Sequence, residues 1–352
     1  MGPLFYARPG GCRAKRSATT VQALRRLGPS SGYRAGVPDT TLPSPETSPE
    51  TPPQPPPESP GGGVGWRRPL GAVLAVALLV GAVVFAARGI DAGALAAQVA
   101  SGGAAGPAAI GVLVGLNLLV TAWLIGSVTA CFGPRPPVPP GRMVRLIAAS
   151  QLLNYLPAVR AGLVARAAFL KRHHGMRLRD SGYVLFITLG LTAVTLGIAS
   201  AGPLLVATLD AEPRWAWAGT AVGLLTLTLA VGTLTRRLPG VGGRGWWWVP
   251  LRTLDLAAVT ARTALAFAAV GQPITVGQAT LLGSSAALVR LTGLTPNGLG
   301  LSEWVVAGLA TALAPVDAAL ATAAALLDRA IEVIFSVVAG CWAVIKLRRV
   351  KS

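Results

Sequence analysis

Long stretches without a charged residue set the main limit on what this chain can fold into. They cover residues 70–87, 108–132, 181–209 and 215–235. A helix rises about 1.5 Å per residue, so about 20 residues cross the roughly 30 Å hydrocarbon core of a bilayer. Only 12% of the 352 residues are charged, whereas soluble domains are about a quarter charged. The sequence therefore predicts an all-α, polytopic helical membrane protein.

The formal net charge of +18 comes from basic residues that cluster between the apolar stretches. They lie in residues 1–68, around 135–179, at 236–244 and in the tail 346–352. Cytoplasmic loops of membrane proteins collect Lys and Arg in this way. Base-stacking aromatic residues are not interleaved with them, so we expect contacts with membrane lipids and no nucleic acid. We therefore predict a protein of the cytoplasmic (inner) membrane with both chain ends in the cytoplasm.

Residues 1–66 are predicted to be disordered, because they are rich in Pro, Ser and Thr and show no apolar periodicity. No signal peptide is apparent, since the first apolar run begins at about residue 70. Residues 67–352 are predicted to form the integral membrane domain. Six crossings fit the distribution of charge: 70–87, 108–132, 181–209, 215–235, 254–270 and 318–345.

Two further segments, 145–175 and 279–314, have the pattern of broken hairpins. The apolar arms of the first hold about ten residues each, or roughly 15 Å. Each hairpin has a proline at its turn, then a glycine, then a charge: Pro157, Gly162 and Arg166 in the first, and Pro296, Gly300 and Glu303 in the second. In the predicted topology they enter from opposite sides, which indicates inverted repeats with a site near the midplane. The alternative is that the two hairpins resemble each other by coincidence in a chain rich in Ala, Leu and Gly. Separately, arms that cross the membrane fully would give eight spans.

The second turn has the sequence TPNGLGLSE, residues 295–303. A proline, Asn297, Gly298 and a second glycine cannot continue a lipid-facing helix, so this backbone must be shielded by protein or line a polar cavity. An ionisable residue at such a break marks a candidate functional site.

Charged residues inside the apolar segments are few, and each needs a partner or a function, because burying one alone costs at least about 2.5–3.5 kcal/mol. They are Arg160, Arg166, Arg262, Arg290, Glu303, Asp328, Arg329 and Glu332. One interpretation pairs Asp328 or Glu332 with Arg262 or Arg290, and Glu303 with an arginine of the first hairpin. The other assigns the excess arginines to an anionic headgroup, because the planar guanidinium can donate two hydrogen bonds to phosphate.

The stretches TPNGLGLSEWVVAGL and ALLDRAIEVIFSVVAG resemble the flippase-like membrane domain of lysylphosphatidylglycerol synthases and their stand-alone relatives. The resemblance lies in Gly298, Leu299, Gly300 and Glu303, in the later Arg329, and in LPAVRAGLVARAAFL with its Pro157, Gly162 and Arg166. It covers roughly residues 67–346. The family usually has an arginine before the glutamate, where this chain has Ser302. The resemblance implies the lipid-handling part without the aminoacyl-transfer domain.

We therefore predict a lipid translocase that moves an anionic lipid or a lipid-linked glycan. Its phosphate would be held by Arg160 and Arg166, with Arg290 as a further candidate, and Glu303 would pair with these arginines or bind a cationic headgroup. The alternative is a non-transporting membrane scaffold that acts through residues 1–66. An enzyme is not expected, because hydrolase, metalloprotease and P-loop motifs are absent from the sequence. A membrane-embedded transferase is therefore the last of the three candidate functions. Scattered cysteines and two adjacent histidines indicate no metal site and no cofactor.

Overall fold

The computed structural model describes residue 93 and residues 105–155, 160–209, 212–237, 241, 243–314 and 316–348. All of them belong to one unit of the chain, residues 62–352. Three expectations lie outside the described residues: the disorder of residues 1–66, the span at 70–87 and the helix break at Pro157.

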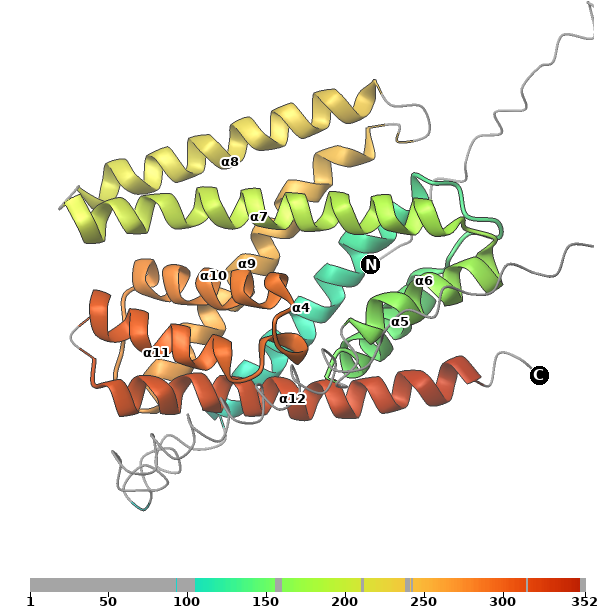
Figure 1. Cartoon of the computed structure of the whole chain (residues 1–352). Helices are drawn as coiled ribbons and strands as arrows, with labels where there is room; N and C mark the ends of the chain where they lie inside the picture. Colours follow the sequence, from blue (N-terminus) through green and yellow to red (C-terminus); the bar gives the residue numbers. More distant parts are fainter. Residues whose placement is uncertain are drawn as a thin grey trace, which may run out of the picture. The chain divides into compact units, whose positions relative to one another are not determined.

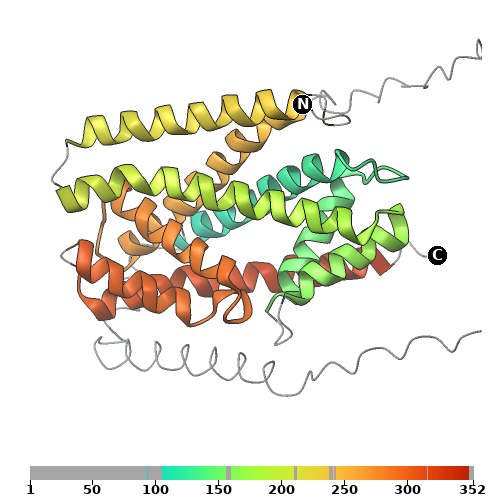
Figure 2. The ribbon, with the colours of Figure 1, turned by 45° about the horizontal axis from the view of Figure 1, so that its top comes forward.

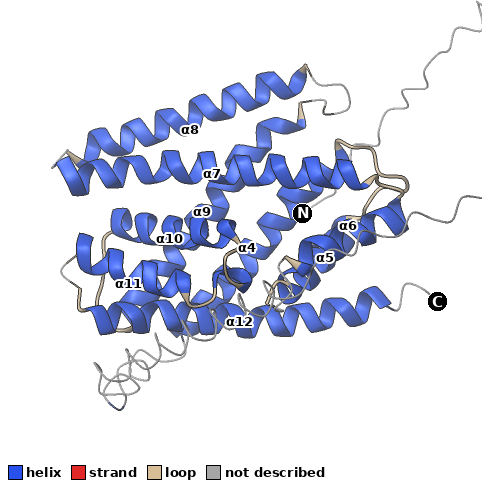
Figure 3. Cartoon of the chain, viewed as in Figure 1, coloured by secondary structure: helices blue, strands red, loops and turns tan. Residues whose placement is uncertain are grey.

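The described part of the chain consists of α-helices and two short 3₁₀ helices, with no strand (Figure 1; Figure 3). Its first half runs α4 (Ala105–Ala130), α5 (Pro140–Leu153), α6 (Ala161–His174) and α7 (Leu178–Leu209). Helix α8 (Pro213–Arg236) follows, and the 3₁₀ helix η1 (Arg244–Trp247) leads into the second half. That half runs α9 (Trp248–Ala269), α10 (Val276–Thr292), η2 (Pro296–Gly298), α11 (Leu301–Leu313) and α12 (Ala318–Arg348). The predicted all-α fold is confirmed.

Four of these helices, α4, α7, α8 and α12, have the length and apolar composition of a membrane span. They coincide with the predicted crossings at 108–132, 181–209, 215–235 and 318–345. Helix α9 covers the predicted crossing at 254–270 except for its last residue, and its 22 residues extend over about 33 Å. Large hydrophobic side chains such as Phe186, which is 78% exposed, cover the outer surface. The chain is a multi-pass membrane protein.

The two predicted hairpins are present as pairs of short helices, α5–α6 and α10–α11. These helices have 14, 14, 17 and 13 residues, or about 20–26 Å, which is less than the hydrocarbon core. Both hairpins lie between α7 and α12, because α5 and α11 contact α12 whereas α6 and α10 contact α7 (Figure 1). The start of α6 and the end of α10 lie close together (Figure 2), and Arg160 donates to the carbonyl oxygen of Leu291 between them. The lengths favour broken hairpins over eight full spans.

Helices α4 to α7 and α9 to α12 form two repeats with the same order of long, short, short and long. Each contact within one repeat has a counterpart in the other: α4–α5 and α9–α10, α5–α6 and α10–α11, α6–α7 and α11–α12. The contacts between the repeats also correspond. Helix α5 packs on α12, its counterpart α10 packs on α7, and the two first helices, α4 and α9, pack on each other. Each repeat crosses the membrane twice and so ends on the side where it began. Helix α8 crosses once between them, so the second repeat begins on the opposite side and is inverted. The contacts thus favour inverted repeats over coincidence.

Local sequence features define the ends of the short helices. Helix α5 begins with Pro140, at a position where a missing N–H leaves no hydrogen bond unmade. Helix α10 begins with a capping box, in which Thr275 Oγ1 accepts from the Gln278 N–H at 3.3 Å and Gln278 Oε1 accepts from the Thr275 N–H at 2.9 Å. It ends at Gly293, whose φ of 66° is the left-handed conformation that commonly terminates helices.

The first hairpin closes where Gly162 of α6 meets the end of α5. The Gly162 N–H donates to Asn154 Oδ1 at 3.0 Å, which satisfies one of the free N–H groups at the start of α6. A Cβ atom on Gly162 would lie only 1.9 Å from the carbonyl oxygen of Ser150. The backbones can approach this closely only with glycine at this position.

We expect Gly162→Ala to lower the free energy of unfolding by roughly 1–3 kcal/mol, because the added methyl group must push the two helices apart. The thermal unfolding midpoint of the purified protein in detergent measures the effect. Gly182→Ala, in α7, is the matched control, since nothing lies within 4 Å of a Cβ there. Equal midpoints for the two variants would contradict the close packing of the hairpin.

Candidate functional site

The carboxylate of Glu332, on α12, lies among three arginine side chains. Its Oε2 is 2.9 Å from Nη2 of Arg262 and 3.2 Å from Nη1 of Arg290. Its Oε1 is 3.1 Å from Nη1 of Arg329. The arginines belong to α9, α10 and α12, so this one carboxylate connects three helices.

Two further carboxylates complete the ionic network. Oδ1 of Asp328 is 2.7 Å from Nε of Arg262. Oε1 of Glu303, in the first turn of α11, is 3.4 Å from Nε of Arg329. The network of three arginines and three carboxylates therefore has no net formal charge. This balance matters because a charge left unpaired inside the membrane is costly.

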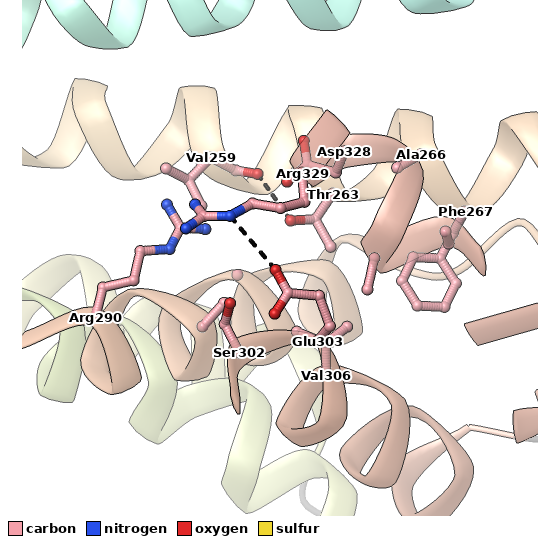
Figure 4. A pocket seen from close by; sticks show the side chains of 14 residues that line it. Val259, Thr263, Ala266, Phe267, Arg290, Ser302, Glu303, Val306, Asp328 and Arg329 are labelled. Atoms are coloured by element: carbon pink, nitrogen blue, oxygen red, sulfur yellow. Dashed lines mark hydrogen bonds and ion pairs between the residues drawn. The ribbon is translucent and has the colours of Figure 1, made fainter. Parts of the chain in front are cut away.

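A cavity of about 30 Å³ borders the network between α9, α10, α11 and α12. Figure 4 shows the carboxylate of Glu303 directed toward Arg329, with Arg290 nearby. Oε2 of Glu303 is buried and has no hydrogen-bond partner among the described residues. Ser302 also lines the cavity, and its hydroxyl donates to the carbonyl oxygen of Gly298 at 3.0 Å. The space is large enough for a water molecule beside the free oxygen of Glu303.

The turns of the two hairpins contact each other through Arg160. Its Nη2 donates to the carbonyl oxygen of Leu291, at the end of α10, at 2.6 Å. Gly293 leaves room for this contact, because a Cβ there would lie 2.9 Å from Nε of Arg160. Arg160 and Asn297 are the two non-glycine residues of the described chain with positive φ, 56° and 49°. Such backbone strain is concentrated at functional sites.

Arg329 connects the ionic network to both turns. Its Nη2 donates to the backbone carbonyl of Asn297 at 2.5 Å. Its guanidinium carbon lies 5.3 Å from the ring centroid of Tyr155, which follows α5, as in a cation–π contact. Gly298, with a φ of 77°, packs against Arg290, since a Cβ on it would lie 2.7 Å from Cγ of that arginine. The position of each turn thus depends on the buried charges.

A larger cavity, of about 120 Å³, lies between the two turns and α7. Its polar lining consists of Asn154, Arg160, Arg290, Thr295 and Asn297. Its apolar lining consists of Leu163, Leu185, Leu189, Leu291, Leu294, Gly293 and Pro296. We call it the turn cavity.

The structure brings several predicted site residues together. Arg160, Arg290, Pro296 and Asn297 line the turn cavity. The predicted pairing of Arg262 and Arg290 with carboxylates of α12 is observed. Gly300, whose φ is 79°, allows the chain to enter α11. The pairing expected for Glu303 was wrong: its partner is Arg329 of α12, not an arginine of the first hairpin.

Arg166 is placed apart from the other candidate residues. Its side chain is 6% exposed and lies on the same stripe of α6 as Gly162 and Leu170. It lines neither of the two cavities, and no described residue forms an ion pair or a hydrogen bond with it. Its assignment to the headgroup therefore stays a prediction.

Sequence reasoning missed a second polar cluster, between α4 and α9. Asp255 is 2% exposed, pairs with Arg252 and accepts hydrogen bonds from Asn117 and Thr121. The signal was present, because Asp255 and Arg252 are three residues apart on one helix. The bond from Asn117 of α4 to Asp255 of α9 is an interhelical hydrogen bond of the kind that joins polar residues of neighbouring spans.

Fold and site together define a multi-pass helical membrane protein in which two opposed hairpins meet beside a buried ionic network. The sequence matches the family described as lysylphosphatidylglycerol synthase TM region over residues 72–250, just over half of the chain. The chain belongs to this family. The match includes the first hairpin and ends before the second, so it does not extend over the ionic network. No curated protein and no solved structure matches the chain.

We expect Glu332→Gln to destabilise the fold by roughly 3–5 kcal/mol, because three arginines would then face two carboxylates in a buried site. Thermal unfolding in detergent measures the effect. Glu212→Gln removes the same charge from a side chain that is 59% exposed and serves as the control. If both variants unfold at the same temperature, the network does not stabilise the fold.

Proposed function

We propose that this protein translocates lipids with an anionic headgroup across the cytoplasmic membrane, and that the turn cavity holds the headgroup. The observation that carries the proposal is Arg160, which lines the cavity and whose guanidinium has a backbone carbonyl as its one hydrogen-bond partner among the described residues. The carboxylates of the ionic network are occupied by other arginines. The positive charge of Arg160 is therefore available to a phosphate group.

The polar and apolar residues that line the turn cavity match the two parts of a lipid. Its arginine, asparagine and threonine side chains suit a polar headgroup, whereas its leucines from α6, α7 and α10 suit the adjoining hydrocarbon. Leu294 lines the cavity and is 64% exposed, so the cavity reaches the outer surface of the helices there. A headgroup can thus enter sideways while the acyl chains stay in the bilayer.

Movement of one repeat against the other would carry the headgroup across. The hairpin turns are joined by the hydrogen bond from Arg160 to Leu291, in which the donor also lines the cavity. A phosphate that engages Arg160 competes with this bond, and this competition couples headgroup binding to separation of the turns. The ionic network, which lies wholly within α9 to α12, would keep the second repeat together as it moves.

The orientation follows from the basic residues. The open end of the first hairpin carries Arg142, Arg145, Lys171 and Arg172. Arg145 lies 5.9 Å from the ring centroid of Trp342, near the end of α12, so this end of α12 lies beside the hairpin opening. We assign this face to the cytoplasm, where positive residues accumulate.

We expect Arg160→Gln to reduce lipid translocation at least about tenfold in liposomes that contain the full chain and a fluorescent phosphatidylglycerol, because a hydrogen bond to a charged group is worth about 1.5–3 kcal/mol. Loss of fluorescence on addition of an external quencher measures the movement. Arg214→Gln is the control, since Arg214 is exposed and pairs with Glu212. Unchanged movement in Arg160→Gln would exclude the turn cavity as the headgroup site.

Deletion of residues 1–66 separates the translocase from the membrane scaffold. A chain that begins at residue 67 should translocate lipid as fast as the full chain, because both cavities and the ionic network lie in later residues. The same liposome assay provides the measurement. Loss of movement on deletion, with the thermal midpoint unchanged, would favour a function that depends on residues 1–66.

A further inference from the structure

The ionisable groups that line the turn cavity are Arg160 and Arg290, and its described lining contains no carboxylate. Arg290 is paired with Glu332 at 3.2 Å. Arg160 has no carboxylate partner among the described residues and donates to the carbonyl oxygen of Leu291. The uncompensated charge of the cavity is therefore a single positive charge.

The neighbouring ionic network does not alter this charge, because its three arginines and three carboxylates balance. It also offers no free carboxylate to a cationic headgroup, since Glu303, Asp328 and Glu332 each have an arginine partner. A headgroup with a second negative charge would have to compete with Glu332 for Arg290. The charge of the cavity thus matches a headgroup with one negative charge.

The remaining polar groups of the turn cavity are uncharged. Thr295 is 3% exposed, and its hydroxyl has no hydrogen-bond partner among the described residues. Asn154 accepts from the Gly162 N–H through Oδ1, and its amide nitrogen donates to none of the described residues. The hydroxyl of Thr295 and the amide nitrogen of Asn154 thus lack partners among the described residues. A hydroxyl group can both donate and accept a hydrogen bond, so these two groups favour a ligand that supplies hydroxyl groups.

We propose that the turn cavity selects lipids whose headgroup has one negative charge, on a phosphodiester, and carries hydroxyl groups beyond it. The inference rests on the proposed translocase function and adds its substrate class. A phosphatidylglycerol and a polyprenyl monophosphate sugar both have this chemistry. A zwitterionic phosphatidylethanolamine lacks the net charge, and lysylphosphatidylglycerol has a net positive charge that Arg160 repels.

The test compares four fluorescent lipids in liposomes that contain the full chain: phosphatidylglycerol, a polyprenyl monophosphate sugar, phosphatidylethanolamine and lysylphosphatidylglycerol. We expect at least one of the first two to cross about tenfold faster than either of the last two, a difference of about 1.4 kcal/mol. The faster of the first two identifies the source of the phosphodiester. Arg160→Glu should reverse the order, so that lysylphosphatidylglycerol crosses faster than phosphatidylglycerol.

Arg214→Glu is the matched charge reversal on an exposed residue and should leave the order of the lipids unchanged. If Arg160→Glu does not fold, Arg160→Gln should bring the rates of phosphatidylglycerol and phosphatidylethanolamine together. Equal rates for all four lipids in the unaltered chain, or fastest movement of lysylphosphatidylglycerol, would overturn the substrate class and leave the translocase. Movement of none of the four would exclude the translocase itself, and the substrate class with it.

Discussion

The contact of Glu332 with three arginines is the interaction on which the rest of the structure depends. It brings one carboxylate against arginines of α9, α10 and α12, and Asp328 and Glu303 complete the charge balance where an unpaired arginine is costly. Arg329 extends this interaction to Glu303, to the backbone of Asn297 and to the ring of Tyr155. The turns that form the turn cavity are thus positioned by the buried charges of the ionic network, one of which, Arg290, also lines the cavity.

The two repeats share one arrangement of helices but differ in their charges. In the second repeat the network joins α9 through α12, whereas the described part of the first repeat has Asp180 as its one carboxylate, at the start of α7. Between the repeats, α4 is held to α9 by the hydrogen bonds of Asn117 and Thr121 to Asp255. The turns are held by Arg160, which also faces the cavity. The polar bonds across the repeats therefore include one that a ligand can compete for.

Composition and local pattern were sufficient to predict the helical membrane fold and the short hairpins, because these depend on length and helix breakers. The i, i+4 spacing of Asp328 and Glu332 placed two carboxylates on one face of α12, which made their pairing with Arg262 or Arg290 one of two interpretations. The partner of Glu303 depends instead on how α11 packs against α12, which spacing along the chain does not encode. The turn cavity likewise exists only because two distant turns meet. Asp255 was overlooked because it stands at the edge of a predicted span, where a charge is unremarkable.

Two non-glycine residues at the turns adopt a backbone conformation that usually favours glycine. Glycine adopts positive φ at little cost, and the chain uses it nearby at Gly293, Gly298 and Gly300. At Arg160 and Asn297 it keeps larger side chains in the same conformation, at a cost of about 1–3 kcal/mol each. Both residues line the turn cavity. The backbone carbonyl of Asn297 accepts from Arg329, and the side chain of Arg160 donates to the carbonyl oxygen of Leu291. Such a conformation persists when the surrounding contacts offset its cost, and these contacts come from the ionic network and from the opposite hairpin.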